Sequence, residues 1–423
     1  MSLRVIPCLL LTATAHAATF TAGYAERDIT PQAPMPMWGY GARHALLAQS
    51  AADPLTARVI VLEAGGIKLA IAGLDLGRAP TFRSLDRIKS LIQEKAGVAH
   101  LMICGSHTHH GPVVELLDEP GLGQGTFDAA VKYVTQLEDA IAAAIIEAAD
   151  KAVPAKLGWG AAEVTLNRNR QKKDEPKPRD PELAVLRFDT LDGQPIVLLV
   201  NFAAHPILQD IRDLRWTCEW PGYMIKAINE QLGAPCVFVQ GAAGDMSPNP
   251  AGERTIQAFG AEVAAEAVKI ARQITPQAPA QPGLQVVEDT FDFKTRLDLQ
   301  NSLIRATFKQ MFFPEILAML QEIPGDTIHP RLITVVLNGQ LALVGGSGEF
   351  FSAHARRLKA ESPAERTLFF GYCNGHQMYF PTREAIDQGG YGTEPSVSWV
   401  EPGAGEYMID TALNHLRALH AAS

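Results

Sequence analysis

Three histidines follow directly on an apolar run, and this segment constrains the fold more than any other part of the chain. It reads Cys104-Gly-Ser-His-Thr-His-His-Gly-Pro112 and follows the run 99–103. The run predicts a buried strand, so the histidines lie at the carboxyl end of a sheet strand, where α/β proteins bind ligands. In an extended backbone, side chains two apart share a face, so His107 and His109 should point together and His110 elsewhere. Two imidazoles on one face supply half of the ligands of a metal site. The alternative interpretation is that these histidines are hydrogen-bonded surface or core residues without a metal.

The same arrangement recurs along the chain, because four further apolar runs lead directly into loops with polar side chains. Imidazole nitrogens and one carboxylate oxygen suit a tetrahedral zinc site, and a catalytic zinc keeps one position for water. Zinc lowers the pKa of that water and polarises a carbonyl under attack, so hydrolysis of an amide or ester is the natural chemistry. Iron or manganese can use the same ligands, and zinc is our preference. The runs 196–203, 236–240, 341–344 and 367–372 lead, in this order, to His205, to Asp245 with Ser247, to Glu349 and to His376.

Strands and helices follow one another in a mixed order, which predicts an α/β fold with mixed β-sheets packed between helices and the site at the carboxyl ends of strands. Glycine turns at Gly65-Gly66 and Asn338-Gly339 predict two hairpins. The charged, proline-bearing stretch 166–181 is expected to be an exposed loop. The turn Met37-Trp-Gly-Tyr-Gly41 either brings backbone close to a ligand or is a plain tight turn. Helices are expected over 81–96, 127–152, 255–274 and 406–420, and a mostly helical stretch over 299–323 with an interruption at Pro314.

Length and charge narrow the possible functions. The chain has 423 residues and a formal net charge of −9. The acidic excess is mild and dispersed, so we expect neither nucleic acid nor an anionic membrane surface as partner. After the N-terminus no segment approaches the ~20 apolar residues of a membrane span. With no internal repeat and no linker, we expect a single domain over 18–423.

The N-terminus resembles a secretion leader. Arg4 precedes the apolar run 5–13, and Ala15-His-Ala17 supplies the small residues of a signal-peptidase site. We therefore expect residues 1–17 to be a signal peptide and the protein to be periplasmic or secreted; a short buried helix is the weaker alternative.

The cysteines are dispersed and show no CxxC spacing. Cys8 lies in the predicted leader, and the others are Cys104, Cys218, Cys236 and Cys373. They form no disulfide framework, and pairing cannot be read from sequence. We interpret Cys104 and Cys373, which lie beside candidate site residues, as packing groups rather than nucleophiles.

Several segments match, in order, the motifs of one known family. The chain resembles the catalytic domain of the neutral/alkaline, non-lysosomal ceramidases from about residue 23 to about residue 391. The resemblance implies an N-acyl amide hydrolase with one catalytic zinc, which cleaves ceramide into sphingosine and fatty acid. The matching segments are Ser106-His-Thr-His-His-Gly-Pro112, Asp180-Pro-Glu-Leu-Ala-Val-Leu-Arg187, Asn201-Phe-Ala-Ala-His-Pro206, Gln240-Gly-Ala-Ala-Gly-Asp-Met-Ser-Pro-Asn249 and Gly348-Glu-Phe350.

The resemblance also implies which residues bind zinc. By position, the family ligands correspond to His107, His205 and Glu349. The fourth family ligand is a tyrosine in an Asn-x-Tyr segment, where this chain has Asn374-Gly-His376. His376 would therefore replace a phenol as the fourth ligand.

Further roles follow from the same resemblance. His109 corresponds to a histidine beside the metal and is a candidate general base or acid; a hydrogen-bonding partner of a ligand, or a ligand of a second metal, are the alternatives. A family arginine that contacts the substrate carbonyl falls at Arg168, with Arg170 as its alternative and a solvated loop charge as the competing interpretation. Tyr379 and Tyr391 are candidates for a phenol that stabilises an oxyanion, and the family has a tyrosine matching Tyr391.

Ser247 follows Gly-Asp and could be a nucleophile, but no histidine adjacent in sequence activates it. We interpret Ser247 as an orienting or substrate-contacting group, and Asp245 as structural or as a support for the ligands.

Two departures from the family limit the substrate prediction. Family members usually continue into a β-sandwich domain, which we do not expect here, and the rim segment His110-Gly-Pro-Val-Val114 differs from their Ser-Gly-Pro-Gly-Gly. The leading hypothesis is a zinc amidase acting on ceramide or another lipid-like N-acyl compound. The alternatives are a metal-dependent esterase or amidase for a smaller acyl group, a serine hydrolase using Ser247, and a non-catalytic binding protein. The oligomeric state stays open.

Overall fold

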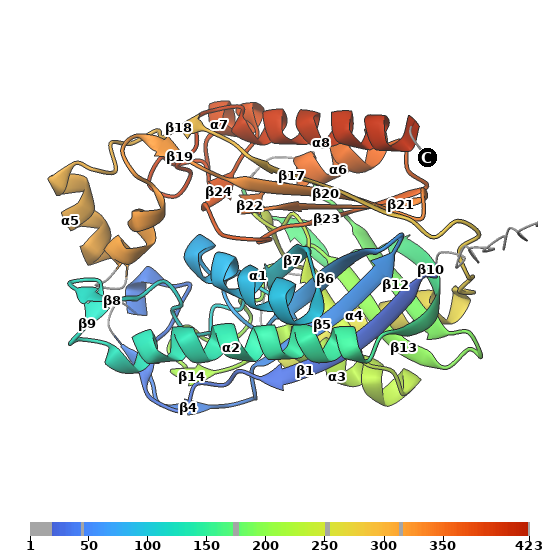
Figure 1. Cartoon of the computed structure of the whole chain (residues 1–423). Coiled ribbons are helices and arrows are strands. Elements are labelled where there is room, and N and C mark those ends of the chain that lie inside the picture. Colours follow the sequence, from blue (N-terminus) through green and yellow to red (C-terminus); the bar gives the residue numbers. More distant parts are fainter. Residues whose placement is uncertain (1–18, 44–45, 172–176, 250–253, 313–315, 422–423) are drawn as a thin grey trace, which may run out of the picture.

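Two β-sheets face one another at the centre of the molecule, and helices cover their outer faces (Figure 1). The computed structural model describes residues 19–43, 46–171, 177–249, 254–312 and 316–421. The predicted leader, residues 1–17, and Pro314 lie outside the described residues. Within the described ranges, no helix combines the length and the apolar character that crossing a membrane requires.

The larger sheet has the order β15-β13-β12-β10-β1-β5-β6-β7. Its neighbours are antiparallel except at the two edges, where β6 pairs with β7 and β13 with β15 in parallel. The strands are β1 (Thr21–Asp28), β5 (Thr56–Ala64), β6 (Ile67–Leu74), β7 (His100–Gly105), β10 (Val153–Glu163), β12 (Glu182–Thr190), β13 (Pro195–Phe202) and β15 (Cys236–Gln240).

The smaller sheet has the order β17-β20-β21-β23, and its β21–β23 edge is again parallel. Two short ladders lie beyond the sheets: β11 pairs with β16, and β22 pairs in parallel with β24. These strands are β17 (Leu284–Thr290), β20 (Arg331–Leu337), β21 (Leu341–Gly346), β23 (Arg366–Phe370), β11 (Asn167–Asn169), β16 (Met246–Pro248), β22 (Glu349–Phe350) and β24 (Tyr379–Phe380).

Alternation of side chains explains why the sheets pack as a sandwich. In β12, Leu183 and Val185 lie in the cluster formed with the helices below, whereas Leu186 and Phe188 lie in the cluster between the sheets. Successive strand residues point to opposite faces, so a strand with apolar residues at every position is covered on both sides. In β20, Ile333 and Val335 likewise face the other sheet, whereas Leu332 and Val336 face the covering helices. Strands that are apolar on both faces therefore place each sheet between two layers.

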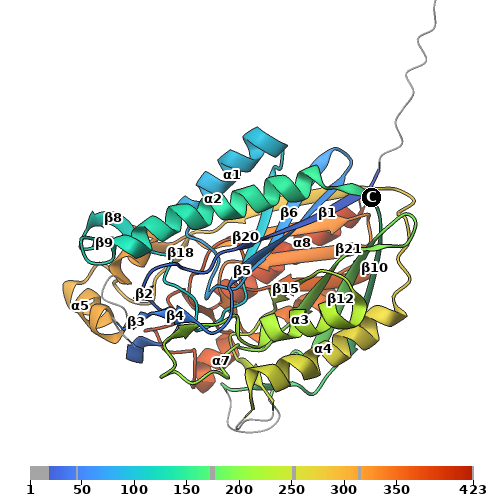
Figure 2. The same cartoon turned by 90° about the horizontal axis from the view of Figure 1, so that it is seen from below.

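Helices complete the outer layers. In Figure 1, α6 (Ser352–Glu361) and α8 (Ala404–Ala421) lie over the smaller sheet. The lower view in Figure 2 shows α3 and α4 on one half of the larger sheet and α1 and α2 on the other. The bounds of the other helices are α1 (Phe82–Ala96), α2 (Asp128–Asp150), α3 (Glu219–Leu232), α4 (Ile256–Gln273), α5 (Ser302–Met311) and α7 (Arg383–Gln388), with 3-10 turns at Gly41–Arg43 and Ile316–Glu322.

Helix α1 shows how local sequence sets the crossover that leads to the histidines. Thr81 caps its first turn by accepting a hydrogen bond from the backbone N of Ser84 at 3.3 Å, and Gly97 ends it in the left-handed conformation at φ 64°. Both are favoured end signals, because the hydroxyl satisfies a free N–H and glycine tolerates a positive φ. The helix joins β6 to the parallel strand β7, so β7 runs toward the site.

The structure confirms the α/β class and most local predictions, including both hairpins and the helices at 81–96, 127–152, 255–274 and 406–420. The prediction that 166–181 is an exposed loop is wrong for its described part. Asn167 and Asn169 are buried in β11, and Asn167 Nδ2 donates to the carbonyls of Asp180 and Ala203 at 2.7 and 2.8 Å. A polar sequence is buried here because its amides find carbonyl partners.

The two edges of the larger sheet approach each other closely. A Cβ on Gly73 in β6 would collide with the carbonyl oxygen of Phe238 in β15. The sheet therefore coils until β15 lies against β6, and only glycine permits that backbone contact. This coiling brings the carboxyl ends of β7 and β15 to one end of the molecule.

We expect Gly73→Ala to destabilise the protein by about 1–3 kcal/mol, because the added methyl group must push β6 and β15 apart. Urea unfolding followed by circular dichroism measures the change. Gly283→Ala is the matched control, since a Cβ there meets nothing within 4 Å, and it should stay within about 0.5 kcal/mol of the parent. Equal effects of the two changes would contradict the close approach.

Candidate metal centre

Loops from both sheets meet at one end of the sandwich. The parallel pairs β6–β7, β13–β15 and β21–β23 each bring strand ends to the same edge. His107 follows β7, His205 follows β13, Glu349 follows β21 and His376 follows β23. All four side chains are buried, with at most 2% of their surface exposed.

Two imidazoles face each other at the centre. His107 Nδ1 lies 2.7 Å from the carbonyl oxygen of Gly77, and His205 Nδ1 lies 3.1 Å from that of Met246. A carbonyl only accepts, so these contacts place the proton on Nδ1 in both rings and leave a lone pair on each Nε2. The two Nε2 atoms are nevertheless 3.0 Å apart.

Glu349 completes a triangle with these nitrogens. Its Oε2 lies 3.3 Å from His107 Nε2 and 3.2 Å from His205 Nε2. Tetrahedral zinc with nitrogen and oxygen ligands near 2.1 Å separates neighbouring ligand atoms by roughly 3.4 Å. The three electron-pair donors therefore have the spacing of ligands around one small cation.

The donor set fits a metal on chemical grounds as well. Two lone pairs and a carboxylate converge in a buried space, where they repel one another unless positive charge lies between them. The carbonyls behind His107 and His205 fix the ring orientation in the manner usual for metal-binding histidines. The residues that could hold the ion are His107, His205 and Glu349, with His376 and His109 beside them.

His376 and His109 lie on either side of the triangle. His376 Nε2 is 3.3 Å from the other carboxylate oxygen, Glu349 Oε1, and neither of its ring nitrogens has a hydrogen-bond partner in the described structure. His109 Nε2 is 3.2 Å from His107 Nε2, and its Nδ1 is likewise buried without such a partner. Each ring thus keeps a nitrogen free for a ligand or for proton transfer.

The backbone around the cluster is held in unusual conformations. His107 has φ 71°, and Tyr372, Asn374 and Met378 have φ between 54° and 61°. Non-glycine residues rarely adopt this region, and each costs on the order of 1–3 kcal/mol. His107 and His109 do converge as the sequence predicts, but through this turn and not through an extended backbone.

Burial and neighbouring charge set the ionisation of the cluster. Burial, followed by Arg170 and His107, lowers the pKa of His205 to about 3. Burial, followed by His107 and His205, holds the pKa of His109 well below its usual range. Burial alone would raise the pKa of Glu349, but the surrounding imidazoles outweigh it and hold that pKa well below its usual range. At neutral pH His109 and His205 are therefore neutral and Glu349 is ionised.

Of the two arginines considered from sequence, Arg170 is the one at the cluster. Its Nη2 lies 2.7 Å from His205 Nε2 and donates to Tyr379 Oη and to the carbonyl of Gly244, each at 3.1 Å. Its guanidinium also lies 4.3 Å from the ring centroid of Tyr391. Arg168 pairs through its backbone with Ser247, and the described structure records no contact between its side chain and the cluster.

The phenols lie on the same side as Arg170. Tyr379 is buried, its Oη is 3.5 Å from Tyr391 Oη, and Tyr391 is half exposed. Tyr372 was missed from the sequence, where it ends an apolar run. Its Oη donates to Glu349 Oε2 at 3.4 Å, and its ring lies 4.2 Å from that of His107. Its place just before the Cys-Asn-Gly-His segment is the signal that could have found it.

An apolar pocket opens beside the cluster. It has a volume of about 140 Å³. The predicted turn 37–41 forms one wall and does bring backbone close to a side chain, since Gly39, at φ 103°, lies against the His109 ring. Trp38 presents its ring edge-on to His107, His109 and His376. The other lining residues are Met37, Tyr40, Gly41, Phe312, Met319, Glu349, Met378, Tyr379, Tyr391, Val397 and Trp399.

The Gly-Asp-Met-Ser segment lies behind the cluster. Asp245 accepts hydrogen bonds from Ser352 N at 2.6 Å, from Ser352 Oγ at 2.9 Å and from Asn169 Nδ2 at 2.7 Å. It therefore ties β15 to the start of α6. Ser247 is buried in β16, and the described structure records no hydrogen bond between its hydroxyl and an imidazole.

His110 points away from the cluster, as its position in the sequence predicts. Its Nε2 lies 2.7 Å from Arg43 Nη2 and 3.2 Å from the carbonyl of Asp210. Burial, followed by Arg43, lowers the pKa of His110 to about 4. Arg43 also donates to the carbonyl of His109, so this pair supports the histidine turn from below.

Comparison with solved structures places the fold. The chain superposes on neutral ceramidase from Pseudomonas aeruginosa with a TM-score of 0.77 and 19% identity, over 96% of this chain and 75% of that one. A ceramidase solved in complex with C2 gives a TM-score of 0.76 and 18% identity, over 96% and 76%. No protein-family model and no curated protein matches the sequence. The comparison confirms the fold predicted from the ceramidase resemblance. At 18–19% identity the likeness supports the fold alone.

We expect the thermal stability of the metal-free protein to fall as the pH is lowered from about 7 to about 4. His205 and His110 have folded pKa values of about 3 and about 4, below the ~6.5 of an unfolded histidine. The unfolded chain therefore binds protons first as pH falls through 6.5, and protonation favours unfolding. Calorimetry across this range measures the slope, which His110→Gln should flatten. A midpoint that holds constant or rises would contradict the buried neutral histidines.

Proposed function

We propose that this protein hydrolyses the N-acyl amide bond of ceramide or a related N-acyl lipid with the help of one bound metal ion, preferably zinc. The observation that carries the proposal is the convergence of His107, His205 and Glu349 beside an aromatic-lined pocket whose wall includes Glu349 and His109. The same fold is found in neutral ceramidase from Pseudomonas aeruginosa.

The four predicted ligands remain our assignment for the metal. His107, His205 and Glu349 supply three donors at mutual distances of 3.0–3.3 Å, and His376 is the proposed fourth. A divalent ion held there would lower the pKa of a bound water and polarise the acyl carbonyl. Arg170 now donates to the lone pair of His205 that the ion would use, so its guanidinium must turn toward Tyr379 and the substrate when the ion is bound.

His109 is the proposed general base. Its ring is buried, neutral at physiological pH and directly beside His107, and one nitrogen lacks a partner in the described structure. A neutral imidazole can take a proton from an attacking water and later deliver it to the leaving amine. The wall formed by Gly39 and Tyr40 holds the ring in place, since Tyr40 packs against it at 4.6 Å between ring centroids.

Arg170 and Tyr379 are the proposed stabilisers of the charge that develops on the acyl oxygen. Both are hydrogen-bond donors, they contact each other at 3.1 Å, and they face the cluster. Burial, followed by Glu349, raises the pKa of Tyr379 well above its usual range, so the phenol keeps its proton. Once the Arg170 guanidinium has turned away from His205, the two donors can stabilise an oxyanion together. We assign the substrate-contacting role to Arg170, whereas the sequence alone favoured Arg168.

The size of the pocket supports a second candidate, a metal-dependent amidase or esterase for smaller acyl groups. The volume of about 140 Å³ is below the ~300–1,000 Å³ of common ligand pockets. A short acyl chain fills such a space, whereas a long chain must extend past Tyr391 to the surface. No observation favours the serine mechanism, because Ser247 has no imidazole partner among the described residues.

The first test joins metal content with activity. We expect about one zinc per chain by mass spectrometry, and cleavage of fluorescent acetyl- and palmitoyl-sphingosine that a chelator abolishes and added zinc restores. His205→Ala should lose metal and activity together, whereas Ser247→Ala should keep the metal. Activity on acetyl but not palmitoyl substrate would select the second candidate. Full activity without metal, lost in Ser247→Ala, would overturn the metal mechanism.

A second test separates the two arginines. We expect Arg170→Met to lower kcat by about 10²-fold, the usual cost of one oxyanion donor, with the metal content unchanged. Arg168→Met is the matched control in the same strand segment and should change kcat by no more than a few-fold. Steady-state kinetics with a soluble N-acyl substrate measures both. A larger loss in Arg168→Met would return the role to Arg168.

A further inference from the structure

Two buried thiols lie directly beneath the candidate metal centre. Cys104 is in β7, three residues before His107, and Cys373 follows β23, three residues before His376. Both are free thiols in the structure, and neither exposes any surface. Cys104 lies in the larger sheet and Cys373 in the loop that follows the last strand of the smaller sheet, and both belong to the apolar cluster between the sheets.

The backbones of these cysteines face each other in a defined register. Cys104 and Cys373 form an antiparallel bridge. Its hydrogen bonds run from Asn374 N to the carbonyl of Ile103 at 2.8 Å and from Gly105 N to the carbonyl of Tyr372 at 3.4 Å. The bonds therefore flank the cysteines, which makes them a non-hydrogen-bonded pair.

This type of pair brings side chains closest together. Its Cα atoms are typically about 4.5 Å apart, within the range of about 4.4–6.8 Å that a disulfide requires. Burial, followed by the neighbouring Cys373 thiol, raises the pKa of Cys104 well above its usual value. The Cys373 Sγ lies over Gly345, and only glycine leaves room for it there, because a Cβ would come within 2.6 Å of the sulfur.

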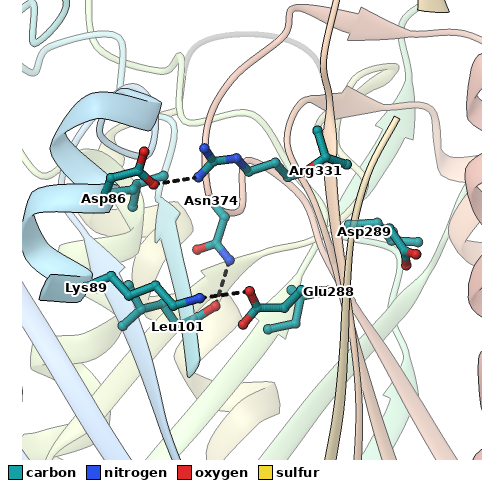
Figure 3. A pocket seen from close by; sticks show the side chains of 11 residues that line it. Asp86, Lys89, Leu101, Glu288, Asp289, Arg331 and Asn374 are labelled. Carbon is teal, nitrogen blue, oxygen red and sulfur yellow. Dashed lines mark hydrogen bonds and ion pairs between the residues drawn. The ribbon is translucent and has the colours of Figure 1, made fainter. Parts of the chain in front are cut away.

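Asn374 fixes the register next to the pair. Its side-chain Nδ2 donates to the carbonyl of Leu101 at 2.6 Å, and its Oδ1 accepts from Ile103 N at 2.9 Å. Figure 3 shows this amide reaching from its loop to Leu101 at the inner end of a charged cavity. The charged groups around it pair with one another, Lys89 with Glu288 and Asp86 with Arg331.

We propose that Cys104 and Cys373 form a disulfide in an oxidising compartment, and that this bond joins the two sheets beneath the metal centre. In the balanced step, one thiolate attacks the disulfide of oxidised glutathione, and one reduced glutathione leaves. The second thiolate then displaces the other glutathione from the mixed disulfide. The two cysteines lose two electrons and two protons, and two glutathione thiols form.

The bond would hold the strained loops in place. His107, Tyr372 and Asn374, all at positive φ, lie within three residues of the two sulfurs. The buried thiols cannot meet an oxidant once the sheets have docked, so the exchange belongs to folding. The bond would then resist reduction in the native protein. This inference is independent of the proposed function.

The test is to refold the whole chain in oxidised glutathione, denature it, alkylate it without reduction and map the peptides by mass spectrometry. We expect a crosslinked peptide pair containing Cys104 and Cys373, with Cys218 and Cys236 alkylated. In reduced glutathione all five cysteines, Cys8 included, should be alkylated, and the thermal midpoint should be lower by about 5 °C. Native-like protein with Cys104 and Cys373 alkylated after oxidative refolding, or crosslinked to other cysteines, would overturn the proposal.

Variants make the stability readout specific. Cys104→Ala and Cys373→Ala should each remove the difference in midpoint between oxidative and reductive refolding. Cys236→Ala is the matched control, because this thiol is equally buried and the hydrogen bond described for it goes to the carbonyl of Val237; the variant should keep the full difference. A difference that persists in both alanine variants would show that this pair is not its source.

Discussion

The carboxylate of Glu349 is the group on which the whole site depends. A buried anion is costly unless positive charge or hydrogen-bond donors surround it. Here its oxygens face three imidazoles whose nitrogens lie 3.2–3.3 Å away, and two of those rings already give their proton to a carbonyl. Arg170 and Tyr372 offset part of this electron density, and a cation among these atoms would complete the balance. The metal proposal therefore rests on the charge balance of the chain's own residues.

The sheets explain why these groups can meet. Each of the three parallel edges ends at the same side of the sandwich, and the loops that follow carry the donors. Glycines at positions of close approach, such as Gly73 and Gly39, let backbones pack where side chains would not fit. The strained residues around the cluster are tolerated because buried sheets on both sides hold them.

Much of the fold could be predicted, since hairpins and amphipathic helices depend on local patterns. The convergence of His107, His205, Glu349 and His376 also followed from strands that end in polar loops. The failures have two causes, distant partners and weak local patterns. The burial of Asn167 required carbonyls far along the chain, and β10 and α3 were missed because glycine, alanine and proline weaken their periodic signal.

The choice between Arg168 and Arg170, and the contact of Tyr372 with Glu349, needed side-chain positions in space. Neighbouring residues of the same type give the same sequence signal, whereas only one of the two arginines reaches the cluster. The roles proposed for Ser247 and Tyr391 are not tested by the structure and stay predictions. The leader prediction concerns residues outside the described structure.

The division of the donors between two sheets sets the order of assembly. More than half of the chain's length separates His107 from His376, and contacts between such distant segments form slowly. A half-built molecule with only one sheet holds at most part of the donor set, so it cannot capture the ion firmly. On the proposed metal assignment, loading of the ion would therefore be the closing event of maturation, at the place where the chain finishes folding.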